Sequence, residues 1–202
     1  MSFPTISKEY PLILASASPR RKRLLQEIGL PFHLMPCDIN EEGIEDSPSN
    51  IARILAEKKA MTAYSRSPNN WILGADTIVL IQEALLGKPL DQEEARSMLT
   101  FLSGREHEVI TGFSIIDPSG NVAHREHVST LVTIKDLSEK EITAYIATGE
   151  PFGKAGGYAI QGIGSFMIKS ITGSYSNVVG LPVHALIEAL LALGALDVFP
   201  ME

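Results

Sequence analysis

The stretch from residue 12 to residue 25 constrains the fold most, because it joins an apolar run to a helical pattern through a very short connection. An apolar run that begins at Leu12 and stops at Ser16 has the length of a strand; Ser18 and Pro19 follow, and a helical apolar pattern begins at Leu24. Proline is tolerated in the first turn of a helix, where its missing N–H would have no intrahelical partner. The pattern therefore predicts a strand, a tight turn and a helix.

The start of this helix has the features of an anion site. Ser16 and Ser18 supply hydroxyl groups there, and backbone N–H groups at a helix start favour negative charge. Four positive charges lie within one turn: Arg20, Arg21, Lys22 and Arg23. This pattern predicts that the helix start binds a phosphate group. The residues leave open the alternative of an ordinary N-cap whose basic side chains lie in water.

Composition restricts the class of protein. The chain has 202 residues, of which 45% are hydrophobic and 20% charged, which is ordinary for a globular protein. Its single cysteine, Cys37, cannot form an intrachain disulfide, and no apolar run is long enough for a signal sequence or a membrane span, so we expect a cytoplasmic protein. A net charge of −7 argues against a partner that is a nucleic acid polymer.

Asp76 is the most suggestive acidic residue. It lies in an apolar run from Trp71 to Leu80, which predicts a strand and contains the less apolar stretch Gly74-Ala75-Asp76-Thr77. An ionised carboxylate between buried strand residues is costly unless it has a partner, which favours a functional role. The alternative is a bulge or turn that needs Gly74 for its backbone.

Ser49 is expected to cap a helix that runs to about Ser65. Lys58 is predicted to lie on or beside the apolar stripe of this helix, where a lysine either extends to the surface or reaches a phosphate. The loop before the helix is acidic, and it is either solvated or a site for a hard cation. Its acidic residues are Asp38, Glu41, Glu42, Glu45 and Asp46.

The segment 153–164 is rich in glycine but lacks the complete dinucleotide-binding fingerprint, so it favours close packing of backbone against a ligand. Two β-type runs, 107–117 and 122–134, predict a hairpin, and 176–182 reads as a loop before a final helix over 183–193. The order of elements predicts an α/β fold with a mixed sheet. We expect one domain, residues 1–202, which can be divided into two lobes.

Five motifs in this order resemble those of the Maf (septum formation inhibitor) family of nucleoside triphosphate pyrophosphatases. They are Ser16-Ala17-Ser18-Pro19-Arg20-Arg21, Gly74-Ala75-Asp76-Thr77, Gly87-Lys88-Pro89, Tyr158-Ala159-Ile160-Gln161-Gly162 and Tyr175-Ser176-Asn177-Val178-Val179-Gly180-Leu181-Pro182. The resemblance implies a mixed β-sheet with flanking helices and two lobes around a nucleotide-binding cleft, similar to the inosine triphosphate pyrophosphatases. It also implies a cytoplasmic protein, often a homodimer, that uses Mg²⁺ or Mn²⁺ to split a nucleoside triphosphate into monophosphate and pyrophosphate.

The resemblance also assigns roles to single residues. It implies that Asp76 accepts a proton from the attacking water and that Asp76 and Glu41 ligate the metal. Cationic positions of the family match Arg21, Lys58 and Lys88. Such cations suit a substrate that brings about four negative charges.

Three positions separate two subgroups of the family, and here they are Arg20, Thr77 and Gln161. All three follow the dTTP/UTP type rather than the 7-methyl-GTP type. A glutamine amide offers both a donor and an acceptor to the neutral edge of uracil or thymine. The resemblance thus implies hydrolysis of dTTP and UTP, or of modified pyrimidine nucleotides, in a house-cleaning role with a link to cell-division arrest.

A second function remains open from sequence. The chain could be a nucleotide-binding regulator of septum formation without significant turnover. The presence of Asp76 together with the lysines favours turnover, because a carboxylate facing a polyanion is of little use to a pure binder unless a metal lies between them.

Overall fold

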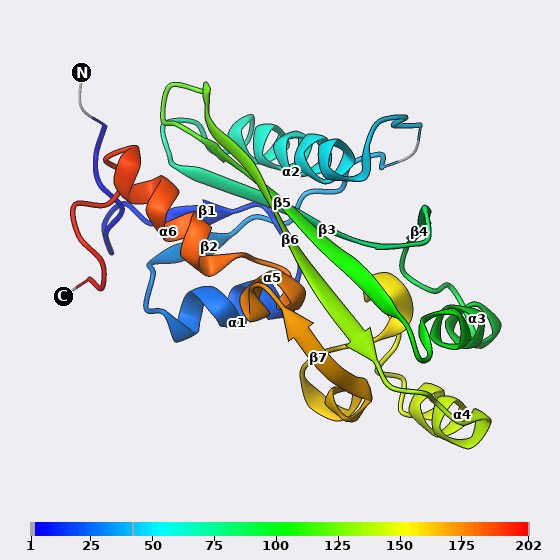
Figure 1. The fold of residues 1–202 in the computed structure, drawn as a ribbon. Coiled ribbons are helices and arrows are strands. Elements are labelled where there is room, and N and C mark those ends of the chain that lie inside the picture. The colour runs from blue at the N-terminus through cyan, green and yellow to red at the C-terminus, as the bar shows by residue number, and fades with distance from the viewer. Residues whose placement is uncertain (1–2, 42, 202) are drawn as a thin grey trace. The chain divides into compact units, whose positions relative to one another are not determined.

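The computed structural model describes residues 3–41 and 43–201, so Glu42 of the acidic loop lies outside the described residues. Over that part of the chain one mixed sheet has seven strands in the order β2-β1-β3-β5-β6-β7, with β4 paired to β3 (Figure 1). The strands are β1 (Leu12–Leu14), β2 (Phe32–Leu34), β3 (Ile72–Ile81), β4 (Ala84–Leu86), β5 (Glu106–Ile116), β6 (Val122–Ile134) and β7 (Ile168–Thr172). β1 is parallel to β2 and β3, whereas β4 is antiparallel to β3 and β7 to β6. The predicted mixed sheet is therefore confirmed.

Helices flank these strands. The α-helices are α1 (Pro19–Glu27), α2 (Pro48–Tyr64), α3 (Gln92–Leu102), α4 (Glu139–Ala147), α5 (Tyr175–Val179) and α6 (Val183–Ala192), and two 3₁₀ helices are η1 (Ala155–Gly157) and η2 (Gly162–Met167). No helix in the described ranges is both long and apolar enough to cross a membrane.

The chain divides into two compact units, in agreement with the two predicted lobes. The first unit contains the residues up to Asp76, Thr111–Val128 and the residues from Gly180 on, and the second contains Thr77–Ile110 and Ser129–Val179. A cleft between lobes and a single-domain organisation stay predictions.

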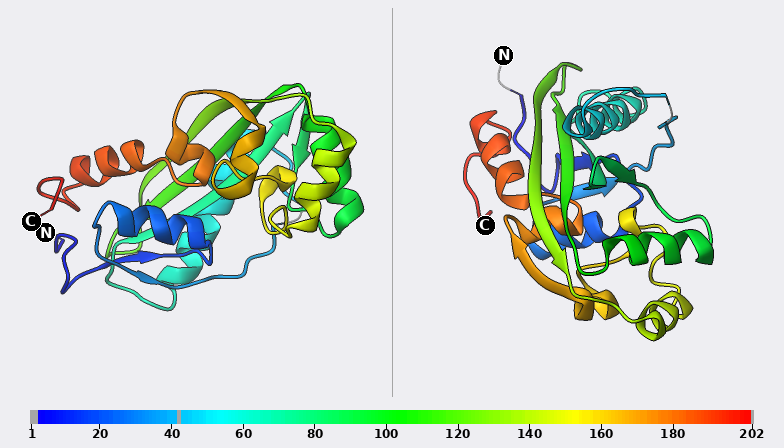
Figure 2. Two further views of the ribbon diagram at one scale, coloured as in Figure 1. Left: turned by 90° about the horizontal axis from the view of Figure 1, so that it is seen from below. Right: turned by 45° about the vertical axis from the view of Figure 1, so that its right-hand side comes forward.

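Small residues let α2 pack closely against the strands of the first unit. A Cβ added to Gly74 of β3 would overlap the carbonyl oxygen of Ala56 and would lie 2.8 Å from the backbone nitrogen of Ala60. Ala60 and Ala63 of α2 are buried in a cluster with Ile72 of β3. Figure 2 shows α2 on one face of the strands of this unit and α6 on the other. The backbone next to Asp76 is thus fixed from the helix side.

The second unit has its own apolar core, made by α3, α4 and the strand segments that belong to it. Leu99 and Leu102 of α3 are buried there with Ile142 and Tyr145 of α4. The two helices lie side by side in Figures 1 and 2. A capping box formed by Ser138 and Glu141 begins α4.

Several local predictions were wrong. The N-cap of α2 is Ser47 rather than Ser49, because Pro48 takes the first helical position. The alternative of a turn at Gly74 is wrong, because β3 is one continuous strand through Gly74–Thr77, as expected for the run from Trp71 to Leu80. The predicted loop 176–182 contains most of the short helix α5.

Candidate active site

Asp76 lies in the middle of strand β3 and belongs to the first unit, whereas the next residue, Thr77, belongs to the second. The residue as a whole is 8% exposed, and its neighbours on the strand are mostly apolar. Burial of an ionised carboxylate is costly unless a cation or hydrogen bonds compensate. The surroundings of Asp76 must therefore supply a partner.

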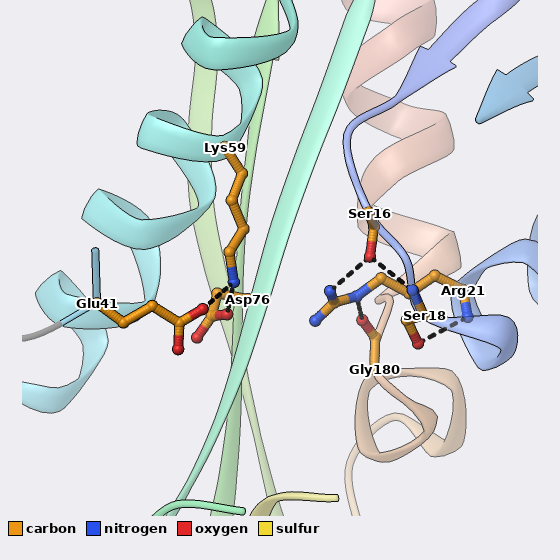
Figure 3. Close-up of polar contacts among 7 residues, drawn as sticks. All are labelled: Ser16, Ser18, Arg21, Glu41, Lys59, Asp76 and Gly180. Carbon is orange, nitrogen blue, oxygen red and sulfur yellow. Dashed lines mark hydrogen bonds and ion pairs between the residues drawn. The ribbon is translucent and has the colours of Figure 1, made fainter. Parts of the chain in front are cut away.

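That partner is Lys59, which extends from α2. Its Nζ atom lies 2.5 Å from Oδ1 of Asp76 and 2.7 Å from Oε1 of Glu41. Figure 3 shows Lys59 and Glu41 meeting at Asp76 from the helix and from the acidic loop. The Lys59 and Asp76 side chains are only 12% and 11% exposed, so this ion pair is shielded from water, while Glu41 is 45% exposed. Two carboxylates thus share one ammonium group.

Of the two alternatives for Lys58, the structure favours the one in which the side chain extends to the surface. Lys58 is exposed, whereas its neighbour Lys59 is half-buried and contacts Asp76. Successive residues of a helix are rotated by about 100°, so one position decides which side chain faces the strand. The sequence does hold a signal for Lys59: Ala56 and Ala63 stand three residues before it and four after it, and both are buried against the strands.

Arg21 is the buried cation at the start of α1. Its Nε donates to the carbonyl oxygen of Gly180 at 2.7 Å, and its Nη1 donates to Oγ of Ser16 at 3.0 Å. Ser18 is the N-cap of α1, and its hydroxyl accepts a hydrogen bond from the backbone N–H of Arg21 at 3.4 Å. Figure 3 shows the guanidinium group directed toward the strand that carries Asp76. The loop and the cap therefore hold Arg21 in one orientation.

Arg21 interacts electrostatically with Asp76, Glu41 and Arg20 in the first unit. Burial lowers the pKa of Arg21, and the negative charge of Asp76 is the largest effect that opposes this shift. Arg20 lowers the pKa of Arg21 further and Glu41 raises it. A guanidinium group keeps its proton in proteins, so Arg21 is a buried positive charge within the field of both carboxylates.

The structure brings together, in one unit, Asp76, Glu41, Arg21, Ser16 and Ser18 of the predicted site residues. The Ser16 hydroxyl accepts two hydrogen bonds, one from Nη1 of Arg21 and one from the backbone N–H of Ser18 at 3.2 Å. Gly180 and Lys59 are the contributors that the sequence did not single out as site residues.

Arg20 is half-buried at the start of α1 in the first unit, and three further predicted site residues belong to the second unit. Thr77 follows Asp76 on β3 and is half-buried, Lys88 is exposed in the loop after β4, and Gln161 is half-buried just before η2. The loop of Lys88 lies beside the glycine-rich segment, since the N–H of Gly156 donates to the carbonyl oxygen of Gly87 at 2.9 Å. The placement of Lys88 and Gln161 beside Asp76 stays a prediction.

Glu41 and Asp76 are also the residues that suit a divalent metal. Their oxygens already converge on one cationic atom, Nζ of Lys59. Among the residues that the structure describes, no group of three or more histidine, cysteine, aspartate or glutamate side chains could hold a metal ion. Two carboxylates fit Mg²⁺, which commonly takes one or two carboxylates and completes its shell with waters and substrate phosphates.

Comparison with known proteins places the chain in a family. The profile of a family described as Maf-like protein matches residues 11–193. A dTTP/UTP pyrophosphatase of Citrifermentans bemidjiense is 48% identical over 190 residues, which cover 94% of this chain and 98% of that protein. A dTTP/UTP pyrophosphatase of Syntrophotalea carbinolica is 47% identical over 194 residues, covering 95% and 88%.

Among solved structures, a HAM1 protein from Coxiella burnetii aligns with 62% of this chain and 73% of that one, at 19% identity and a TM-score of 0.44. That likeness is too distant to bear on the site. The family match spans most of the chain and includes all five motifs from Ser16 to Pro182. This chain belongs to the Maf-like protein family.

Proposed function

We propose that this protein is a nucleoside triphosphate pyrophosphatase that hydrolyses dTTP and UTP to the monophosphate and pyrophosphate. The observation that carries the proposal is the buried Asp76 carboxylate, which is held by Lys59 in the field of Arg21. Two relatives that are 47% and 48% identical over almost the whole chain are dTTP/UTP pyrophosphatases, which supports the same reaction and the same substrates for this protein.

Asp76 is the proposed proton acceptor. Lys59 contacts Oδ1 of this carboxylate, so we assign proton acceptance to Oδ2. A water oxygen forms a bond to the α-phosphorus, and the bond from that phosphorus to the bridging oxygen breaks. The electron pair leaves with pyrophosphate, and Asp76 takes the proton of the water. A strand embedded in the core keeps the carboxylate in place during the reaction.

Lys59 and Arg21 are the proposed partners of the phosphates. The charge that develops on the leaving pyrophosphate is stabilised by cations that are already oriented. Arg21 meets this requirement because Ser16 and Gly180 fix its guanidinium group. Lys88 is proposed as a third cation, contributed by the second unit.

A divalent cation, Mg²⁺ or Mn²⁺, is the proposed cofactor, with Glu41 and Asp76 as its protein ligands. When bound, such an ion polarises phosphoryl oxygens and neutralises their charge. Lys59 occupies the space between the two carboxylates in this structure, so metal binding requires its ammonium group to turn toward the phosphates.

Base recognition is proposed for Arg20, Thr77 and Gln161. The amide of Gln161 can donate to a carbonyl oxygen and accept from the N3–H of uracil or thymine. This pairing distinguishes both bases from cytosine, whose N3 carries no hydrogen.

The experiment replaces Asp76 by asparagine and measures pyrophosphate release from dTTP with Mg²⁺. Asp76→Asn keeps the shape of the side chain and removes its basicity, so we expect turnover to fall by a factor of roughly 10² or more. Asp38→Asn is the matched control, because Asp38 is exposed in the acidic loop and the change is chemically identical. Turnover of Asp76→Asn near that of the control would remove Asp76 from the mechanism.

A further inference from the structure

Glu150 holds the glycine-rich segment on the C-terminal side of Gln161. Its Oε1 accepts a hydrogen bond from the N–H of Ile163 at 3.1 Å, and its Oε2 accepts one from the N–H of Gly164 at 2.7 Å. One carboxylate therefore binds two consecutive amides, one with each oxygen. These amides stand two and three residues after Gln161.

The other side of Gln161 is joined to the same carboxylate through Tyr145. The N–H of Ala159, two residues before Gln161, donates to the Tyr145 hydroxyl at 3.2 Å. The Tyr145 hydroxyl in turn makes a hydrogen bond to Glu150. We call this set the Glu150 clasp: the side chains of Glu150 and Tyr145 with the N–H groups of Ala159, Ile163 and Gly164. It spans the residue that is proposed to read the base.

The carboxylate of the clasp is itself well fixed. Glu150 follows the end of α4, where its N–H donates to Oγ1 of Thr148 at 3.1 Å and its carbonyl oxygen accepts from Nζ of Lys154. Burial alone would raise the pKa of Glu150, but hydrogen bonds from Gly164, Tyr145 and Ile163 outweigh burial and hold this pKa below its ordinary value. The acceptor is thus a carboxylate at neutral pH.

Glycine is required where the segment meets the clasp. Gly162 has a positive φ of 73°, and a Cβ at this position would overlap Oε1 of Glu150. A Cβ on Gly164 would overlap the carbonyl oxygen of Ala159 and would lie 2.7 Å from the Tyr145 hydroxyl. The two glycines let the backbone approach the carboxylate and the phenol closely, and that approach fixes the path of the chain around Gln161.

We propose that Glu150 is a positioning residue for base selection: through the clasp it sets the backbone conformation of the segment that presents the Gln161 amide. The inference rests on the proposed function, because it assumes that Gln161 reads a pyrimidine edge. A hydrogen-bonded base tolerates little displacement of its partner, so loosening of the backbone on both sides of Gln161 weakens discrimination between bases.

The test variant is Glu150→Gln, which keeps the size of the side chain but turns one acceptor oxygen into an NH₂ group facing a backbone N–H. Glu93→Gln, an exposed glutamate on α3 of the same unit, is the matched control. Tyr145→Phe removes the hydroxyl and keeps the ring, so it tests the clasp independently if Glu150→Gln fails to fold. Kinetics use dTTP, UTP and CTP, and Gln161→Ala serves as the reference for lost base reading.

We expect Glu150→Gln to raise KM for dTTP and UTP by about tenfold with kcat within about threefold, and to reduce the preference for dTTP over CTP toward that of Gln161→Ala. The double variant Glu150→Gln/Gln161→Ala should show no larger loss of preference than Gln161→Ala alone, because both changes act on one contact. An unchanged preference in Glu150→Gln and Tyr145→Phe, or additive losses in the double variant, would overturn the inference.

Hydrogen exchange of the unliganded full-length protein separates this inference from the proposed function. Exchange at the amides of Ile163 and Gly164 should speed up by at least about tenfold in Glu150→Gln and stay unchanged in Glu93→Gln. If these two amides exchange at equal rates in wild type and Glu150→Gln, the inference that Glu150 fixes this backbone is overturned, even if dTTP is cleaved. Wild-type protein that shows no preference for dTTP and UTP refutes the proposed function and the base-selecting role of Glu150, whatever the exchange rates are.

Discussion

His107 should make the stability of the protein depend on pH in a way that a single substitution removes. This side chain on β5 is 3% exposed, and its Nε2 lies 2.7 Å from the hydroxyl of Tyr158, within the glycine-rich segment. Burial lowers the pKa of His107 from 6.5 to about 4. The folded protein therefore keeps the imidazole neutral over a range in which the unfolded chain protonates it.

The sign and size of the effect follow from linkage. Because the folded-state pKa of His107 is depressed, the unfolded state binds the proton more readily, and stability that is fully present above pH 6.5 is lost as the pH falls toward 4. At about 1.4 kcal/mol per pKa unit, the whole shift corresponds to roughly 3 kcal/mol. Between pH 7 and pH 5 the part lost is about 2 kcal/mol.

The assay is urea unfolding of wild type and His107→Gln at pH 7 and pH 5, because glutamine cannot titrate and can still hydrogen-bond the Tyr158 hydroxyl. Other ionisable groups contribute equally to both proteins and cancel in the difference. We expect wild type to lose about 2 kcal/mol more than the variant between the two pH values. Parallel losses, within about 0.5 kcal/mol, would refute the reasoning.

Four further predictions concern the site and its support. Lys59→Met should lower kcat/KM for dTTP by roughly 10², whereas Lys58→Met should change it less than about threefold; similar losses in both would contradict the placement of Lys59. Excess chelator should abolish pyrophosphate release and added Mg²⁺ or Mn²⁺ should restore it. Full turnover in excess chelator would contradict a role for the metal. Gln161→Glu should cost about 1–3 kcal/mol in kcat/KM for dTTP and UTP, and an unchanged ranking of dTTP, UTP, CTP and 7-methyl-GTP would mean that the base is read elsewhere. Gly74→Ala should destabilise the fold by about 2 kcal/mol or more in urea unfolding, because its Cβ meets the α2 backbone; wild-type stability would show that α2 can shift.

Local signals predicted much of the fold. The pair Ser138 and Glu141 marks a helix start within four residues of chain, and Pro19 after Ser18 marks another. Such capping patterns depend only on neighbours in sequence, so they can be read without knowledge of the tertiary structure. The mixed sheet followed from the order of the elements, and Asp76 stood out because the surrounding residues are apolar.

Side-chain partners across the chain could not be predicted in the same way. Lys58 and Lys59 differ by one helical step, and only packing of the alanines of α2 shows which of them reaches β3. Arg21 and Gly180 are 159 residues apart, and no local pattern joins them. Glu150 gave no signal, because its role depends on amides in a later, irregular segment.

Some expectations from sequence stay predictions. They are the homodimer, the cytoplasmic location, the absence of nucleic acid partners, the link to cell division and the approach of Lys88 and Gln161 to Asp76. Each of these concerns a partner, a place or an arrangement of the two units, which the contacts within one unit do not determine.

The most direct test of the central claim identifies the products that the purified protein makes from single nucleoside triphosphates. The protein is incubated with dTTP, UTP, CTP or 7-methyl-GTP and Mg²⁺, and pyrophosphate and orthophosphate are measured separately. The proposed reaction predicts dTMP or UMP with one pyrophosphate per nucleotide, from dTTP and UTP in preference to the other two. Release of orthophosphate, or binding of dTTP without any product, would contradict it.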